Sequence, residues 1–180
     1  ITNPMEAGIN QLLRYCNNRK PEENEGAEKL FYYNQMLVST YNKQARLGTI
    51  SSRYEHYLEW KDVYPKNIEN FKNNTSQEVL IEGVFNHKNF LDIIRNFTIF
   101  EVVEGKTIKK ITRYQQYRAV HKTTKKITQG KNKKEKGGII WHTQGSGKSL
   151  TMVFLAQVIR RNRELKKYKL LYITDRTQLD

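Results

Sequence analysis

The most constraining feature of the sequence is a glycine-rich segment between two apolar runs. It reads His142-Thr143-Gln144-Gly145-Ser146-Gly147-Lys148-Ser149, after Gly138–Trp141 and before Leu150–Ile159. This order predicts a strand, a turn and a helix. Such a junction binds phosphate, because backbone N–H groups of the turn converge on the anion and the helix dipole adds positive potential. We expect Lys148 to reach the β- and γ-phosphates of a nucleotide and Ser149 to bind Mg²⁺.

The segment departs from the strict phosphate-loop pattern at one position. His142 stands where G-x-x-x-x-G-K-[ST] requires its first glycine. The shortened form, Gly145-Ser146-Gly147-Lys148-Ser149, resembles motif I of superfamily 2 helicases and translocases, in which the first glycine is commonly replaced. A chance Gly-Lys-Ser in an ordinary loop is the alternative, and the predicted strand and helix on either side disfavour it.

Composition narrows the class of protein. No apolar run approaches the roughly 20 residues of a membrane span, and no secretory leader is visible. We therefore expect an intracellular protein without a membrane partner. Cys16 is the single cysteine and is expected to be a buried apolar residue rather than a nucleophile. The chain starts at Ile1 without a methionine, so we expect a piece of a longer polypeptide.

Positive charge is concentrated in the second half of the chain. Residues 106–180 hold 20 Lys and Arg against 4 Asp and Glu, a net +16, whereas residues 1–105 hold 12 against 14, a net −2. A basic segment favours a polyanionic partner such as duplex DNA. A solvated lysine-rich surface is an equally good explanation of the composition alone.

The first half predicts a helix followed by paired strands. Asn3 and Pro4 are typical of a helix start. Apolar residues follow at helical spacing: Met5, Ile9, Leu12, Leu13 and Cys16. Leu30–Tyr41 and Ala45–Ser51 are rich in aromatic and β-branched residues and predict two paired strands. Gln11 and Tyr15 share one face of the helix, and this bare Q-x-x-x-Y pattern alone favours a surface pair.

The middle of the chain contains the expected domain boundary. Helices are predicted at Glu78–Val84 and Asn89–Phe97, then a strand at Phe97–Val103 that Gly105 ends. Charge and pattern both change between residues 87 and 105. We therefore expect a first domain over residues 1–87 and a second over residues 88–180.

The second half predicts an α/β domain. A helix is expected at Lys109–Ile127, and Thr128–Lys136 reads as an exposed basic loop whose lysines either contact DNA phosphates or are only solvated. Leu170–Thr174 predicts a buried strand. With the strand and helix around the glycine-rich segment, it forms a βαβ unit of a parallel sheet, which is the start of a RecA-like domain.

Longer motifs resemble one family. Trp141-His142-Thr143-Gln144-Gly145-Ser146-Gly147-Lys148-Ser149, together with Ile173-Thr174-Asp175-Arg176 and Arg113-Tyr114-Gln115-Gln116, resembles the R subunit of type I restriction enzymes. Gly83-Val84-Phe85-Asn86 and Asn89-Phe90-Leu91-Asp92-Ile93-Ile94 resemble that family's passage from nuclease to motor. The resemblance therefore spans nearly the whole chain.

The resemblance implies a fold and a function. It implies the end of a restriction-endonuclease-like nuclease domain, then the start of a superfamily 2 motor that translocates duplex DNA with ATP and Mg²⁺. Partners would be methyltransferase and specificity subunits in the prokaryotic cytoplasm. The nuclease carboxylates (D…E-x-K) and the D-E-x-H box are absent from this sequence, so the chain alone is expected neither to hydrolyse ATP nor to cut DNA.

The resemblance also implies roles for individual residues. Gln116, with Gln115 as the alternate, would pair with the adenine edge, because an amide both donates and accepts. Thr174 and Arg176 would touch a DNA backbone. Gln11 and Tyr15 would match the Q-x-x-x-Y helix that supports the nuclease site. The nucleotide-binding set would be completed by the segment itself: Thr143, Gln144, Gly145, Ser146, Gly147, Lys148 and Ser149.

Two other classes remain open. One is a different superfamily 2 enzyme, such as a type III restriction subunit or a helicase without a nuclease. The other is a non-catalytic basic module that binds nucleic acid and carries a degenerate phosphate loop. An E-x-K strand upstream of this segment would distinguish the type I restriction subunit from the first alternative. DNA affinity that is unaffected by Lys148→Ala would favour the second.

Overall fold

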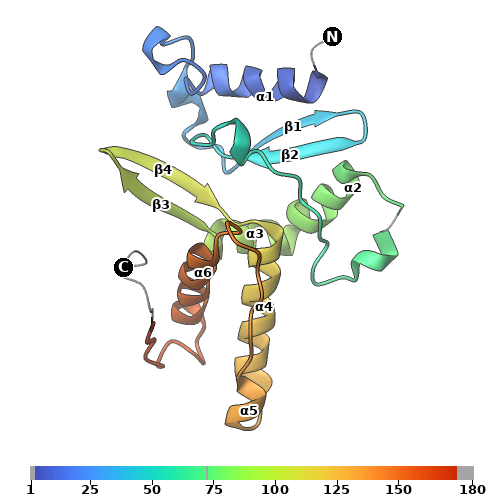
Figure 1. Ribbon diagram of the computed structural model, residues 1–180, viewed down its shortest axis with the longest axis vertical. Helices are drawn as coiled ribbons and strands as arrows, with labels where there is room; N and C mark the ends of the chain where they lie inside the picture. Colours follow the sequence, from blue (N-terminus) through green and yellow to red (C-terminus); the bar gives the residue numbers. More distant parts are fainter. Residues whose placement is uncertain (1–2, 72, 174–180) are drawn as a thin grey trace. The chain divides into compact units, whose positions relative to one another are not determined.

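The computed structural model describes residues 3–71 and 73–173. The chain folds into two compact units, an N-terminal unit (Ile1–Tyr114) and a C-terminal unit (Gln115–Asp180) (Figure 1). From the sequence we assigned a first domain to residues 1–87 and a second to residues 88–180. This assignment stays a prediction, because the division into compact units does not show which activity each unit carries. No helix within the described ranges is both long and apolar enough to cross a membrane.

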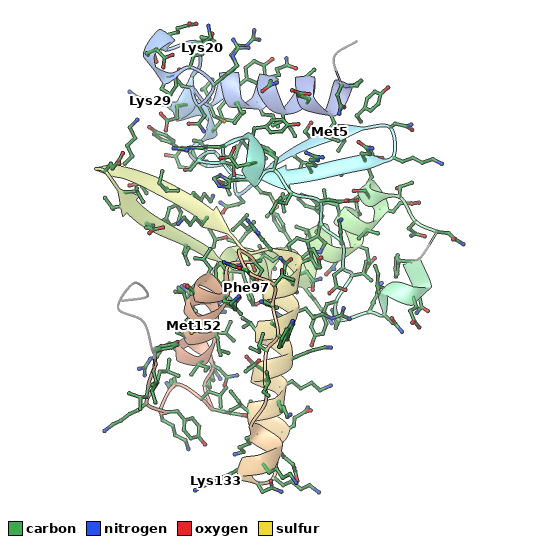
Figure 2. All side chains as sticks on the ribbon, in the orientation of Figure 1. Met5, Lys20, Lys29, Phe97, Lys133 and Met152 are labelled. Carbon is green, nitrogen blue, oxygen red and sulfur yellow. The ribbon has the colours of Figure 1, made fainter. Side chains whose placement is uncertain are left out.

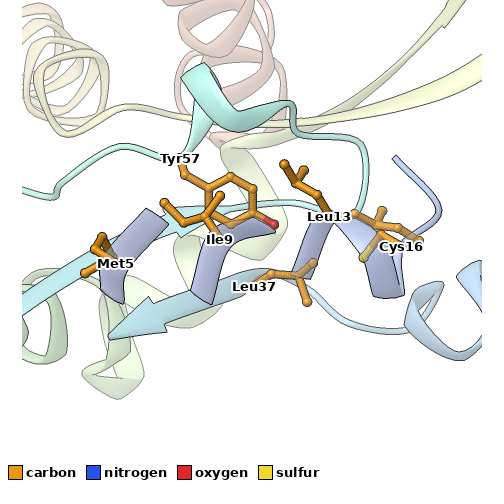
Figure 3. Close-up of a cluster of buried hydrophobic side chains, with 7 residues drawn as sticks. Met5, Ile9, Leu13, Cys16, Leu37 and Tyr57 are labelled. Atoms are coloured by element: carbon orange, nitrogen blue, oxygen red, sulfur yellow. The ribbon is translucent and has the colours of Figure 1, made fainter. Parts of the chain in front are cut away.

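Helix α1 (Pro4–Tyr15) organises the first core of the N-terminal unit. The Asn3 side chain caps it by accepting a hydrogen bond from the backbone N–H of Met5 at 3.1 Å, as the sequence predicted. Its apolar stripe lies in a cluster with residues from later segments (Figure 3). The buried members are Met5, Ile9, Leu13, Cys16, Leu37, Ile50 and Tyr57. The expectation that Cys16 is buried is confirmed, since it is only 2% exposed.

The predicted strand pair is confirmed as a hairpin beside α1 (Figure 1). Strands β1 (Leu37–Tyr41) and β2 (Gln44–Gly48) run antiparallel, with Tyr41 opposite Gln44. Asn42 takes the left-handed conformation that the tight turn needs, with φ of 51°. The first strand is shorter than predicted because Glu28–Phe31 forms a 3₁₀ helix, η2. Further short 3₁₀ helices in the described residues are η1 (Pro21–Glu23), η3 (Tyr54–His56) and η4 (Ile68–Phe71).

The second part of the N-terminal unit is helical, as predicted. Helix α2 (Ser76–Leu80) continues as a π-helical turn, η5 (Ile81–Phe85), and α3 (His87–Asn96) follows. Asn89 is 4% exposed and donates from Nδ2 to the carbonyl oxygens of Tyr64 and Gly83, each at 2.8 Å. These bonds tie α3 to the preceding turn and to an earlier loop, so the buried amide specifies how three segments join.

A second hairpin corrects the helix that we predicted from Lys109. Strands β3 (Thr98–Val103) and β4 (Lys106–Ile111) pair antiparallel. Glu104 and Gly105 both have positive φ, 50° and 76°, so the turn reverses the chain. The prediction of β3 is confirmed, but the following helix starts only at Tyr114. The spacing of the apolar residues after Lys109 suggested a helix, and the sequence pattern did not show that β4 pairs with β3.

The C-terminal unit consists of three helices in the described residues. They are α4 (Tyr114–Gln129), α5 (Lys133–Lys136) and α6 (Lys148–Arg161). The segment predicted as a loop, Thr128–Lys136, is therefore partly helical. Asn132 caps α5, and its Oδ1 accepts a hydrogen bond from the backbone N–H of Glu135 at 3.0 Å. That local cap, together with the continuation of α4 to Gln129, orders a stretch whose composition alone suggested a coil.

The predicted strands on either side of α6 do not form in the described residues. Residues 138–141 and 170–173 have no strand hydrogen bonds, and both described sheets are two-stranded antiparallel hairpins. Their apolar side chains are exposed: Ile139 by 93%, Trp141 by 88%, Leu171 by 84% and Ile173 by 88%. A parallel strand takes its hydrogen bonds from a neighbouring strand, and no described segment pairs with either one.

Buried ionisable groups predict how the first core responds to alkaline pH. Burial, and secondarily Glu28, raises the pKa of Cys16 from 9.0 to about 11. The pKa of the neighbouring Tyr57 is also raised by burial. In the unfolded chain Cys16 ionises near pH 9.0, so its contribution to stability is complete below that pH and is lost as pH rises towards 11.

We therefore expect the thermal unfolding midpoint of the chain to fall between pH 9 and pH 11. A Cys16→Ala variant starts lower, because its core has lost a sulfur, but its midpoint should fall less over the same interval. Circular dichroism melts at several pH values measure both. Equal falls in the two proteins would show that ionisation of Cys16 is not coupled to folding.

Candidate phosphate-binding site

The glycine-rich segment, residues 142–149 and hereafter the phosphate loop, forms a tight turn before α6. Gly145 and Gly147 both have left-handed backbone, with φ of 74° and 80°. Between them Ser146 is held by the carbonyl oxygen of Thr143, to which its Oγ donates at 2.7 Å and its backbone N–H at 3.3 Å. Only glycine adopts such φ values readily, so the two glycines fix the path of the loop.

The loop leads directly into the N-terminus of α6. Gly147 is the N-cap residue, and it has no side chain with which to cap this 14-residue helix. The first backbone N–H groups of the helix and its dipole favour an anion at this end. Thr143, Gln144, Gly145, Lys148 and Ser149 are exposed. The arrangement thus leaves donors and side chains of the loop accessible from solvent.

The Lys148 side chain folds back onto the phosphate loop. Its Nζ donates to the carbonyl oxygens of His142 and Thr143 at 3.4 and 3.2 Å. Both distances are at the long end for a hydrogen bond to nitrogen. A phosphate oxygen would bind the ammonium group more strongly than these neutral carbonyls, because the bond would be charge-assisted at both ends.

Gln116 of α4 supports the phosphate loop through the loop's backbone. It is 1% exposed, and its Nε2 donates to the carbonyl oxygens of Ser146 at 3.3 Å and Gly147 at 3.0 Å. The sequence resemblance implied that Gln116 reads adenine, and that role stays a prediction. The support of the loop was missed, because its acceptors are backbone carbonyls and leave no motif in the sequence.

Gln115, the alternate adenine reader, is half-buried. Its Oε1 is buried and accepts no hydrogen bond within the described part of the chain. A buried acceptor without a donor is costly. Both glutamines of the predicted segment are therefore close to the interior, and only Gln116 is shown to contact the phosphate loop.

The structure brings the predicted pair Gln11 and Tyr15 together on α1. Gln11 donates from Nε2 to the Tyr15 hydroxyl. The Tyr15 ring stacks on Phe31 with centroids 6.3 Å apart, and the Arg14 guanidinium lies 5.4 Å from the Tyr15 ring centroid. Support of a nuclease site stays a prediction. No cluster of three or more metal-ligating side chains occurs among residues 3–71 and 73–173.

Thr174 and Arg176, the predicted DNA contacts, lie outside the described residues. Their role therefore stays a prediction. The described part of the chain ends at Ile173, one residue before this motif.

Comparison with known proteins relates the C-terminal unit to an ATPase family. The family model of SWI2/SNF2 ATPases matches residues 115–180, which include Gln116 and the whole phosphate loop. The C-terminal unit is therefore similar to ATPases of this helicase-like class. No solved structure matches the chain significantly.

Two relatives are similar to this chain over all or nearly all of its length. The endonuclease subunit of the type I restriction enzyme HindI, from Haemophilus influenzae, is 36% identical over the full chain. A Methanocaldococcus jannaschii protein, provisionally named type I restriction enzyme MjaIXP endonuclease subunit, is 29% identical over 95% of the chain. The chain is thus homologous to type I restriction endonuclease subunits, as its motifs predicted. It spans 17% and 18% of the lengths of these two relatives.

The fit between Gly147 and Gln116 gives a test of the loop geometry. A Cβ on Gly147 would lie 2.5 Å from Gln116 Nε2, whereas one on Gly145 would meet nothing within 4 Å. Both glycines have positive φ. We expect Gly147→Ala to lower the free energy of unfolding by about 1–3 kcal/mol, and Gly145→Ala to cost less because it adds strain without a clash.

Urea unfolding of the two variants measures this difference. Adding Gln116→Ala to Gly147→Ala removes the clashing amide, so the double variant should lose less than the sum of the single losses. Equal costs at the two glycines, with strictly additive losses in the double variant, would contradict the contact between α4 and the loop.

Proposed function

We propose that the chain belongs to a subunit that translocates duplex DNA with ATP and cleaves it at a separate Mg²⁺-dependent nuclease site. One observation carries the proposal. A loop with two left-handed glycines leads into α6, inside the region that matches SWI2/SNF2 ATPases. Homology of the whole chain to type I restriction endonuclease subunits supports the nuclease part. Methyltransferase and specificity subunits would be its partners in the prokaryotic cytoplasm.

The residues of the phosphate loop fit a nucleoside triphosphate. Gly145 has open space where a side chain would stand, and the Lys148 ammonium lies over the loop on weak acceptors. Lys148 would bind the β- and γ-phosphates, and Ser149 would hold Mg²⁺ through its hydroxyl. The metal would neutralise part of the negative charge on the phosphates. Loop N–H groups and Lys148 would stabilise the negative charge that develops during transfer, which is the main catalytic effect for such reactions.

We further propose that the exposed apolar segments 138–141 and 170–173 join a parallel sheet in the whole subunit. Their large exposed side chains include Ile139, Trp141 and Leu171. Burying apolar surface stabilises a protein by about 25 cal/mol per Å², so these side chains favour a neighbouring layer. The proposed architecture is thus the end of a nuclease domain over residues 1–87, followed over residues 88–180 by a linker and the start of the first RecA-like domain.

A motor without a nuclease is the second candidate. The SWI2/SNF2 match on its own fits it equally well, because the match begins at residue 115. Two observations favour the restriction subunit. The first is the similarity of residues before 115 to restriction endonuclease subunits, and the second is the hydrogen-bonded pair Gln11 and Tyr15 on α1.

Replacement of Lys148 tests the proposed ATP hydrolysis. In the full-length subunit assembled with its partners and DNA, Lys148→Ala should lower ATP turnover by about 10²-fold or more, as does loss of one preorganised charge-stabilising group. Lys167→Ala is the matched control, because Lys167 is also exposed in the same unit. Turnover within twofold of the unaltered subunit in Lys148→Ala would refute the proposal. The 180-residue chain alone should show no turnover that Lys148→Ala removes.

Nucleobase preference tests the proposed adenine reader. Gln116→Ala and Gln115→Ala are compared in the full-length subunit for their affinity towards ATP and GTP. Because Gln116 supports the loop, we expect its replacement to weaken both nucleotides, by about fivefold for hydrogen bonds worth about 1 kcal/mol. The residue that reads adenine should also lose preference for ATP over GTP. An unchanged preference in both variants would show that this segment does not read the base.

A further inference from the structure

We propose that a cluster of seven lysines at the far end of α4 and on α5 binds the phosphate backbone of duplex DNA. This lysine arm consists of Lys122, Lys125, Lys126, Lys131, Lys133, Lys134 and Lys136. The inference rests on the proposed function as a DNA motor and assigns a contact surface to it. Figure 1 shows α5 at the end of α4, and Figure 2 shows Lys133 there.

The arm presents its charge to solvent from an ordered backbone. All seven lysines are exposed. Lys122, Lys125 and Lys126 are three and four residues apart on α4, so they share one face of the helix. After the turn at residues 130–132, Asn132 caps α5 and places Lys133, Lys134 and Lys136 within one helical turn. The lysines are thus held together by regular structure.

The lysines of the arm form no ion pairs within the described part of the chain. Its one acidic residue, Glu135, is occupied by the cap: its carboxylate accepts from the backbone N–H of Lys131 at 2.8 Å and from Asn132 Nδ2 at 2.6 Å. Lysines of the N-terminal unit do form ion pairs, for example Lys66 with Glu82 at 2.7 Å.

The charge density of the arm favours a polyanion. Residues 122–136 carry seven Lys and one Glu, a net +6. One helical turn is about 5.4 Å, less than the screening length of about 8 Å at physiological salt, so neighbouring lysines repel one another. Duplex DNA carries one charge per roughly 1.7 Å of its axis. Several phosphates could therefore face the arm at once and relieve that repulsion.

The composition of the arm favours a duplex over a single strand. Single-strand binding commonly uses aromatic side chains on which bases stack. Residues 122–136 contain no aromatic residue. The arm can therefore contact phosphates but offers no stacking platform, which suits a duplex whose bases are already stacked.

A charge-matched pair of triple variants tests the arm. Lys122→Gln, Lys125→Gln and Lys126→Gln are combined in the full-length subunit; glutamine keeps the helix propensity of lysine. The control combines Lys29→Gln, Lys43→Gln and Lys88→Gln, three exposed lysines of the N-terminal unit without ion pairs among the described residues. The probe is a duplex without a recognition site, titrated by fluorescence anisotropy over a range of salt concentrations without nucleotide.

Each phosphate contact contributes about 0.9 to the magnitude of the slope of log affinity against log salt, so the loss of three contacts in the arm variant should reduce that magnitude by about 2.7. The control should leave the slope unchanged. An unchanged slope in the arm variant, an equal fall in both variants, or a loss seen only with single-stranded DNA would overturn the proposal. ATP turnover distinguishes failure of the lysine-arm proposal from failure of the proposed function. If the slope is unchanged in the arm variant but Lys148→Ala still abolishes ATP turnover, the arm does not bind DNA and the proposed function stands.

Discussion

The left-handed backbone at Gly147 is the constraint on which the candidate site depends. It ends the phosphate loop, starts α6 and brings the loop carbonyls within reach of Gln116. A side chain at this position would collide with that amide. The loop conformation and the support from α4 therefore depend on the same residue. Because Gly147 has no Cβ, it can adopt the left-handed backbone angle and also leave room for the Gln116 amide.

The two units fix their local structure in different ways. In the N-terminal unit, buried amides and caps join segments that are far apart in the sequence, as Asn89 does for α3. In the C-terminal unit, long helices carry exposed charge, and the loop is held by few hydrogen bonds. We propose that this loop admits a triphosphate, and such a loop can be held loosely, since the ligand itself supplies acceptors for the loop's donors.

Local signals in the sequence predicted local structure well. The Asn3 cap follows from a capping residue, the hairpin of β1 and β2 from aromatic and β-branched residues, and the turn into α6 from glycines. Features that depend on distant partners were not predictable in this way. The pairing of β4 with β3 overrode a helical pattern, and the apolar runs beside α6 have no partner strand in the described residues. Gln116 supports the loop through backbone carbonyls, which no motif records.

The central claim is that the phosphate loop binds the triphosphate of ATP through its backbone. Hydrogen–deuterium exchange of the full-length subunit, with and without ATP and Mg²⁺, tests it most directly. We expect the amides of residues 145–149 to exchange more slowly when nucleotide is bound, because their N–H groups would donate to phosphate oxygens. Unchanged exchange in this loop under saturating nucleotide, with protection elsewhere in the subunit, would contradict it.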